Sequence, residues 1–139
     1  MTMKALDPFD SNIHLLKKVL DLRSYNQSVI ASNIANSETP GYHRKEFQFD
    51  SELQNAIMHP AGSMITTHQK HIPFSTSNFN NIKGKVVEFK DESGIGDENS
   101  VSVDAEMIEL SENELLYETV AQLLKKKLGM LTYAIQEGK

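Results

Sequence analysis

The sequence predicts a mainly α-helical fold in which a long N-terminal helix and a long C-terminal helix pair as a coiled coil or helical hairpin. Apolar residues recur every three or four positions at both ends of the 139-residue chain, which is the spacing of amphipathic helices. Between them, residues 37–100 predict an irregular middle segment with short β-strands, because turn-forming residues are frequent there. We therefore divide one structural domain into an N-terminal helix within 1–36, a partly disordered middle of turns and loops over 37–100, and a C-terminal helix within 101–139.

The N-terminal helix is expected from about Asp10 to Asn36. One apolar stripe contains Phe9, Ile13, Leu16, Leu20, Ile30 and Ile34, and Arg23 and Gln27 fill its two middle positions. A second stripe beside it contains Leu15, Val19, Leu22 and Val29. Two adjoining apolar faces predict neighbours on more than one side of this helix. Its start can be capped by Asp7, Asp10 or Ser11.

The segment after this helix, NSETPGY, has the composition of a type II turn. Pro40 fixes φ at the first corner, and Gly41 can adopt the positive φ of the second. Asn36 can end the helix, and Tyr42 and Phe47 offer rings that could cover the point where the chain leaves it. An ordinary helix-to-loop turn is the alternative interpretation of the same residues.

The middle segment carries weaker signals. Phe47 and Phe49 alternate with polar neighbours, SELQNAI could form one or two helical turns, and short strands are expected at Met64–Thr67 and Lys85–Phe89. The stretches STSNFNNIKG and KDESGIGDENS contain too few apolar residues to order themselves, so we expect both to be mobile in the isolated chain.

The C-terminal helix is expected from about Val103 to Ile135, which is roughly 50 Å at 1.5 Å per residue. A heptad seam, interrupted only by Glu114, contains Val103, Met107, Leu110, Tyr117, Ala121, Leu124, Leu128, Leu131 and Ile135. Ser102 can cap the helix, and Asp104, Glu106 and Glu109 lie near its positive end. Such a helix is longer than a domain of this mass comfortably covers.

Composition excludes several classes of partner. Fourteen basic and nineteen acidic residues give a net charge of −5, so nucleic acid is not expected as a partner. No run of eighteen apolar residues occurs, so no direct membrane insertion is expected. The start, MTMKALDPFD, lacks the apolar run of a cleaved signal peptide.

No residues stand out as catalytic, cofactor-binding or metal-binding. His68 and His71 have a spacing that would suit a helix, but Thr66 and Thr67 precede them and Pro73 follows. We interpret the five histidines as loop or surface residues; they are His14, His43, His59, His68 and His71. The sequence has neither a G-x-S-x-G nucleophile motif nor a glycine-rich phosphate loop. We therefore expect no enzyme activity and no cofactor.

The two terminal helices have two interpretations. They could form the core of a soluble, monomeric helical-hairpin adaptor, or they could pack in a larger bundle of subunits. Three features favour assembly: the helices are long relative to the middle, the first has two apolar faces, and aromatic residues make up only 7% of the chain. We name them the N-terminal and C-terminal assembly helices.

The segment SNIANSETPGYHRKEFQF resembles the N-terminal signature of the flagellar rod and hook axial proteins. The matching residues are Asn33, Ile34, Ala35, Asn36, Thr39, Pro40, Gly41, Tyr42 and Arg44. The C-terminal helix is similar to that of one short proximal rod member, through Val101 or Val103, Glu106, Met107, Asn113, Tyr117, Gln122, Leu123 and Leu124. The family's usual Gly-Asn-Asn before this helix is replaced by GDENS. Another short rod protein of the same family is the alternative.

This resemblance implies a structural subunit of the bacterial flagellar rod, located in the periplasm. It implies export from the cytoplasm through the flagellar type III apparatus, without a cleaved signal peptide. The implied partners are further copies, other rod proteins, the rod-base adaptor protein and the basal MS ring. The resemblance and the apolar pattern together predict an assembly seam of Leu16, Leu20, Ile30, Ile34, Met107, Leu110, Tyr117, Leu124, Leu128 and Leu131.

Overall fold

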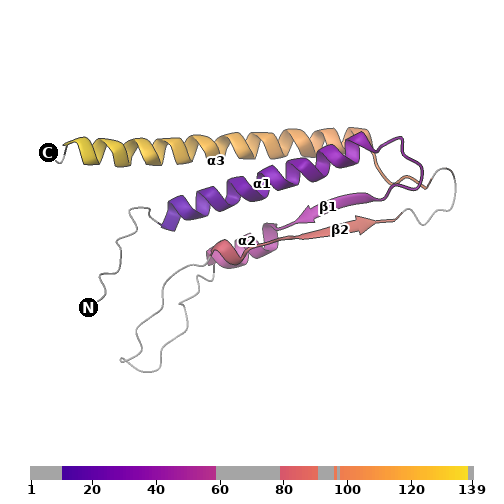
Figure 1. The fold of residues 1–139 in the computed structure, drawn as a ribbon, viewed down its shortest axis with the longest axis horizontal. Coiled ribbons are helices and arrows are strands. Elements are labelled where there is room, and N and C mark those ends of the chain that lie inside the picture. Colours follow the sequence, from indigo (N-terminus) through magenta and orange to yellow (C-terminus); the bar gives the residue numbers. More distant parts are fainter. Residues whose placement is uncertain (1–10, 59–78, 91–95, 97, 138–139) are drawn as a thin grey trace, which may run out of the picture.

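The computed structural model describes residues 11–58, 79–90, 96 and 98–137. Its elements are α1 (Ser11–Ala35), β1 (Arg44–Gln48), α2 (Asp50–Met58), the short 3-10 helix η1 (Phe79–Asn81), β2 (Lys85–Phe89) and α3 (Val103–Glu137). Figure 1 shows α1 between two neighbours, with α3 along one side and the β1–β2 hairpin along the other. The fold class predicted from the sequence, two long paired helices and a middle segment with short strands, is therefore confirmed.

The two long helices pack side by side and run antiparallel (Figure 1). Asn33 near the end of α1 contacts Glu106 near the start of α3, and Asn26 contacts Asn113 further along. Continuing this register places Ser11 near residue 128, so α3 extends about ten residues past the described part of α1. None of the helices in the described segments combines the length and apolar composition that a membrane span requires.

The middle segment forms a two-stranded antiparallel sheet that the sequence predicted only in part. Its strands are separated in sequence by α2 and η1, and we call the pair of strands the β1–β2 hairpin. Its register runs from Arg44 opposite Phe89 to Gln48 opposite Lys85. The strand predicted at Lys85–Phe89 is confirmed, whereas β1 was marked only by its alternating phenylalanines. The helical turns predicted for SELQNAI lie within α2. The strand predicted at Met64–Thr67 lies outside the described residues.

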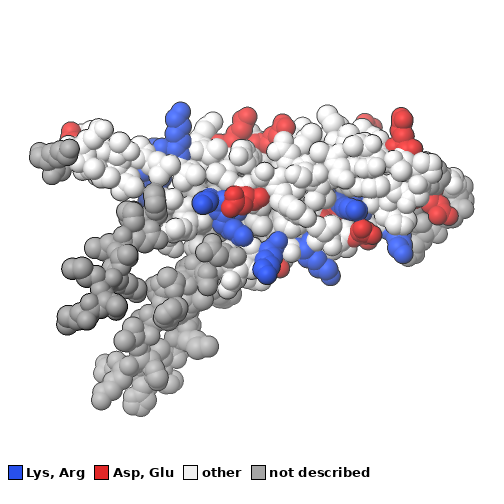
Figure 2. All heavy atoms as spheres, viewed as in Figure 1, with Lys and Arg blue, Asp and Glu red and all other residues white. Residues whose placement is uncertain are grey.

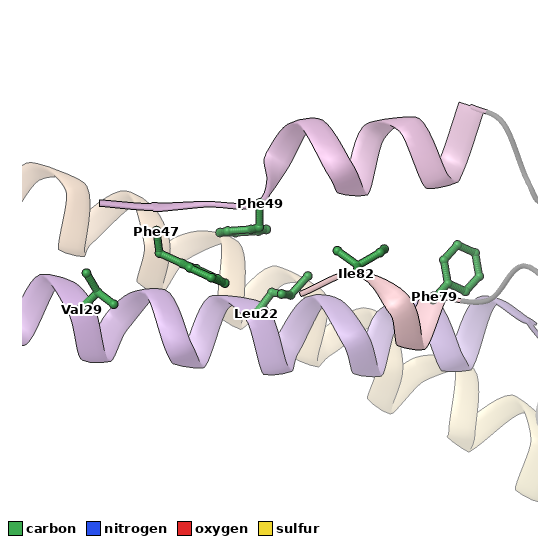
Figure 3. Close-up of a cluster of buried hydrophobic side chains, with 6 residues drawn as sticks. All are labelled: Leu22, Val29, Phe47, Phe49, Phe79 and Ile82. Atoms are coloured by element: carbon green, nitrogen blue, oxygen red, sulfur yellow. The ribbon is translucent and has the colours of Figure 1, made fainter. Parts of the chain in front are cut away.

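The main hydrophobic core lies between α1 and the hairpin, not between the two long helices (Figure 3). It consists of Leu22, Val29, Phe47, Phe49, Phe79 and Ile82. Phe47 packs edge-on against Tyr25 at 4.6 Å between ring centroids and stacks on Phe49 at 5.1 Å. The second apolar stripe of α1 therefore covers the hairpin, as expected for a helix with neighbours on two sides.

Residues 79–84 correct one sequence expectation. STSNFNNIKG was expected to be too polar to order itself, and for its described part this is wrong, because Phe79 and Ile82 are buried in the core. The backbone amides of Lys83 and Gly84 donate hydrogen bonds to the Glu52 carboxylate of α2. Two apolar side chains are enough here because α1 and β1 supply the rest of the core.

Replacing Gly84 by Ala should destabilise the hairpin strongly. Gly84 has φ +66°, and an added Cβ would lie 2.5 Å from two ring atoms of Phe47. Left-handed backbone costs roughly 1–2 kcal/mol for a residue with a Cβ, and overpacking costs about 1–3 kcal/mol. Urea unfolding should therefore show a loss of about 2–5 kcal/mol.

Gly129 provides the matched control for this substitution. It lies inside α3, and an added Cβ would meet nothing within 4 Å. Gly129→Ala should leave stability unchanged or raise it by about 1 kcal/mol, because Ala has the higher helix propensity. Equal stabilities for Gly84→Ala and the parent chain would contradict the packing of Gly84 against Phe47.

Candidate assembly interface

The end of α1 leads into a tight turn. The Tyr42 amide donates to the Thr39 carbonyl at 3.2 Å, and Gly41 between them has φ +71°. These are the hydrogen bond and the positive φ of a type II turn with Pro40 and Gly41 at its corners. The Asn36 amide still donates to the Ser32 carbonyl, and the Asn36 side chain donates to the same oxygen at 2.8 Å. The chain therefore leaves the helix in a fixed direction.

Gly41→Val should impair incorporation of the chain into its assembly. An added Cβ would meet nothing within 4 Å, so the cost arises from the backbone alone. A left-handed φ costs roughly 1–2 kcal/mol in an L-residue, and a β-branched residue tolerates it least. The turn should open and redirect the chain toward β1. Gly41→Asn is the control, since Asn adopts this conformation more readily. Incorporation should fall for Val and persist for Asn; equal incorporation of both variants would show that the turn conformation is not required.

Asn33 is the residue on which α1, β1 and α3 converge. It is fully buried, and its side-chain amide donates to the Lys45 carbonyl at 2.6 Å and to Glu106 Oε2 at 2.9 Å. Its Oδ1 accepts from the Lys45 amide at 3.0 Å and from the Tyr42 hydroxyl at 3.3 Å. The amide side chain thus pairs with the outer edge of β1 as a neighbouring strand would, and satisfies backbone groups that would otherwise lack a partner.

Arg44 joins β1 to the first two turns of α3. Its Nε donates to Glu106 Oε1 at 2.5 Å, and its Nη2 donates to Glu109 Oε1 at 2.6 Å. A third carboxylate, Glu46, accepts from Nη1 at 3.0 Å. The Glu106 side chain is fully buried and that of Arg44 is 18% exposed, so this ion pair is largely shielded from water. Burial alone would lower the pKa of Arg44, but the hydrogen bonds to Glu106 and Glu46 raise it overall.

The other two carboxylates around Arg44 respond to acid in opposite directions. Burial raises the pKa of Glu109, although the charge of Arg44 opposes the shift. The stability linked to Glu109 is therefore fully present below the ordinary pKa of Glu and is lost as the pH rises through the folded-state value. Hydrogen bonds from Gln48 and Arg44 lower the pKa of Glu46, so its stabilisation is lost as the pH falls. Because the Glu106 side chain is fully buried and that of Glu109 is 44% exposed, Glu106 is the stronger anchor for Arg44.

The loop before α3 is tied to the same place. The Asn99 side-chain nitrogen lies within 2.9 Å of the carbonyls of Asn36, Ser37 and Thr39, and its Oδ1 accepts from the Val101 amide. Ser100 Oγ donates to the Phe89 carbonyl and accepts from the Arg44 amide. Asn99 therefore supplies further donors to the carbonyls of the turn that follows α1, two of which also accept a backbone amide. We call Asn33, Arg44, Asn99, Ser100 and Glu106 the helix junction.

A second set of polar contacts continues along the pair of long helices. Asn113 is buried; its side-chain nitrogen donates to the Arg23 carbonyl at 2.9 Å, and its Oδ1 accepts from Asn26 at 3.2 Å. The side-chain nitrogen of Gln27 donates to the carboxylate of Glu114, the residue that follows Asn113 in α3. A buried polar residue in a coiled-coil interface fixes register and orientation, because any shift leaves it unpaired. Polar contacts therefore specify how α1 and α3 align.

The structure separates the predicted seam into covered and exposed residues. Ile30 is buried, and Leu16, Leu20, Ile34, Leu110, Leu124 and Leu131 are partly buried. Met107, Tyr117 and Leu128 are 48%, 36% and 38% exposed in the single chain. The part that all ten seam residues take in assembly stays a prediction. Of the family-motif residues, Asn33 and Arg44 belong to the helix junction, and the Tyr42 hydroxyl donates to Asn33. Asn36 and Thr39 make local side-chain hydrogen bonds at the end of α1 and in the turn. Pro40 and Gly41 form the turn, and Ile34 and Ala35 lie in the last turn of α1.

Sequence reasoning missed several members of this site. The sequence marks Glu106 only as a charge near the positive end of the helix dipole and as a motif residue, and nothing in it indicates the pairing with Arg44, 62 residues earlier. Asn99 was part of a segment expected to be mobile; residues 91–95 and 97 of that segment lie outside the described residues. The available signal was the Asn in GDENS, three residues before the Ser102 cap.

In the part of the chain that the structure describes, the histidines do not form a cluster. His14 is exposed on α1 and His43 is partly buried beside the turn, while His59, His68 and His71 lie outside the described residues. Within the described segments, no three His, Asp or Glu residues form a group that could hold a metal ion.

Comparison with known proteins relates the junction to a family. The sequence profile described as "Flagella basal body rod protein" matches residues 20–43, which include most of α1 and the Thr-Pro-Gly turn. The flagellar basal body rod protein FlgB of Bacillus subtilis (strain 168) is 31% identical over 131 residues, which cover 94% of this chain and 98% of that protein. The chain belongs to the FlgB family of flagellar basal body rod proteins.

Other FlgB relatives are similar over most of their length. The FlgB protein of Aquifex aeolicus (strain VF5) is 31% identical over 124 residues, which cover 89% of this chain and 92% of that protein. The protein of Borrelia hermsii is 33% identical over 117 residues, which cover 78% and 84%. The family predicted from the Asn-Ile-Ala-Asn and Thr-Pro-Gly-Tyr residues is thereby confirmed, and three of the motif residues of this FlgB-family chain, Asn33, Arg44 and Glu106, meet in the helix junction.

Proposed function

We propose that this chain is a structural subunit of the bacterial flagellar basal-body rod. The observation that carries this proposal is its 31% identity to a flagellar basal body rod protein along 98% of that protein's length. A relationship over the whole length supports the same role for the whole chain, whereas a match to the turn alone would not. We place the subunit in the proximal part of the rod, where it polymerises through its terminal helices as part of the drive shaft.

The mechanism is mechanical and needs no chemical step. The junction holds α1, β1 and the start of α3 in one arrangement through buried polar contacts. Most of α3 is exposed in the single chain, including Met107, Tyr117 and Leu128. Neighbouring subunits would cover this apolar surface, with a gain of roughly 25 cal/mol per Å² buried. Torque would then pass from subunit to subunit by packing.

The route and the neighbours follow from the family resemblance. We propose export from the cytoplasm through the flagellar type III apparatus without a cleaved signal peptide, followed by assembly in the periplasm. The proposed partners are further copies of the chain, other rod proteins, the rod-base adaptor and the MS ring. Neither nucleic acid nor direct membrane insertion has a part in this scheme.

Electron microscopy of basal bodies tests the proposal. In a strain that lacks the gene, rings should form without a rod, and the intact gene should restore the rod. Complete rods and filaments in the deletion strain would overturn the role of an essential rod subunit and favour the soluble helical-hairpin adaptor. If a different short rod protein of the family restores the rod in the deletion strain, the chain is still a rod subunit, but its position within the rod differs from the one proposed.

A further inference from the structure

The side of α3 turned away from α1 carries an apolar stripe outside the predicted seam. It consists of Ile108, Leu115, Leu123 and Met130, and we call it the outer stripe. Their exposed fractions in the single chain are 62%, 66%, 51% and 54%. At 3.6 residues per turn, Ile108 and Leu115 lie roughly opposite Glu106 and Asn113, which face α1, and Leu123 and Met130 lie about a quarter to a third of a turn away from that face. A stripe over most of a 35-residue helix, exposed along its length, indicates a surface that another protein covers.

The outer stripe is symmetric in sequence about Thr119. Ile108 and Met130 both lie eleven residues from Thr119, and Leu115 and Leu123 both lie four residues from it. The charges repeat the pattern with opposite sign, since Glu112 and Lys126 each lie seven residues away. Both charged side chains are exposed, and neither forms an ion pair within the described segments. In Figure 2, acidic side chains project from the N-terminal half of α3 and basic side chains from its C-terminal half, and one further acidic side chain lies at its C-terminal end.

We propose that the outer stripe binds the outer stripe of a second copy, with the two α3 helices antiparallel and a two-fold axis at Thr119. This arrangement places Ile108 against Met130 and Leu115 against Leu123, each twice. It also places Glu112 of each copy against Lys126 of the other. The same surface serves both subunits, as a two-fold interface requires.

Other pairings of the same two helices match fewer of the charged and apolar side chains of the outer stripe. A parallel, in-register pair would bring Glu112 beside Glu112 and Lys126 beside Lys126, and like charges repel. A parallel pair shifted by fourteen residues would join Glu112 to Lys126, but it would place Ile108 beside Gln122 and Leu115 beside Gly129. Of these three arrangements, only the antiparallel one matches the charges and both apolar pairs.

This dimer goes beyond the proposed rod role and does not depend on it. A two-fold contact is closed, so it cannot extend into a filament. It would cover the apolar stripe of free chains and would have to dissociate before a head-to-tail contact could use the same surface. The tests below use the purified chain, so their outcome is independent of any basal-body phenotype.

A single introduced cysteine tests the two-fold axis. The chain contains no cysteine, and Thr119 would lie next to its own copy, within the 4.4–6.8 Å Cα separation that a disulfide spans. Thr119→Cys should form a covalent dimer on mild oxidation, as seen by non-reducing gel electrophoresis. Ser111→Cys is the matched control: its hydroxyl, like that of Thr119, bonds the carbonyl four residues earlier, but it would lie roughly 24 Å along the helix from its own copy.

Charge exchange tests the pairing of Glu112 with Lys126. Sedimentation velocity should show a concentration-dependent dimer for the parent chain. Glu112→Lys and Lys126→Glu should each weaken it by about tenfold or more, and the double variant should restore it. Circular dichroism should show unchanged helix content, because both side chains are exposed. A chain that stays monomeric up to its solubility limit, equal cross-linking through positions 119 and 111, or no rescue by the double variant would overturn the proposal.

Discussion

Glu106→Gln is expected to lower the free energy of unfolding by roughly 3–5 kcal/mol, the usual cost of removing one partner from a buried ion pair. The substitution keeps the size of the side chain but removes its charge. The Gln amide would also turn a donor toward Arg44 Nε or Asn33 Nδ2, which are both donors themselves. Since Glu106 is fully buried, water cannot replace the lost contact.

Glu109→Gln is the matched control on the same helix. Its carboxylate also binds Arg44, but the side chain is 44% exposed and burial already raises its pKa. Exposed ion pairs contribute about 0–1 kcal/mol, so urea unfolding should show only a small change. The Gln variant should also lose the part of the acid response that comes from Glu109. Equal losses for the two variants would contradict the buried junction as the main link between β1 and α3.

Leu128→Asp is expected to abolish rod assembly while leaving the single chain folded. In the register of the two helices Leu128 lies opposite Ser11, at the very end of the described part of α1, and it is 38% exposed. The stability of the free chain should therefore change by only about 0.5 kcal/mol. In the assembled rod the same position would be covered, and a buried carboxylate without a partner is strongly unfavourable. Motility should be lost, and basal bodies should lack rods.

The control for Leu128→Asp is Gln136→Asp, which adds the same charge at an exposed polar position of α3 outside the family motif. Detection of both variants outside the cytoplasm would separate a failure of assembly from a failure of export. Normal motility of the Leu128→Asp strain would contradict the assembly seam.

The long helices could be predicted from the sequence because their apolar spacing extends over many turns. The expected ends differ from the observed ends by one or two residues; α1 ends at Ala35 and α3 at Glu137. The Thr-Pro-Gly turn could also be predicted from the sequence, because Pro40 and Gly41 restrict the backbone locally. Local chemistry decides both features, so no knowledge of distant contacts was needed.

The helix junction could not be predicted because its pairs are distant in sequence. Glu106 pairs with Arg44, 62 residues earlier, and with Asn33, 73 residues earlier. Apolar periodicity suggested that hydrophobic side chains align α1 with α3, whereas Asn113 and its partners do so through hydrogen bonds. A periodicity argument assigns polar residues to the solvent face and therefore overlooks buried polar pairs.

The hairpin core shows the same limit on a smaller scale. Phe79 and Ile82 lie in a polar stretch, and only the neighbouring α1 and β1 make them part of a core. The ten-residue stretch STSNFNNIKG contains no residue of α1 or β1, so its own composition could not indicate this burial.

The most direct test of the account is a cryo-electron microscopy map of the rod within isolated basal bodies. We predict density for this chain in the proximal rod, with α1 and α3 antiparallel, Glu106 beside Asn33 and Arg44, and Leu128 covered by a neighbouring subunit. A rod without this chain, or one in which its two terminal helices lie apart, would contradict the account.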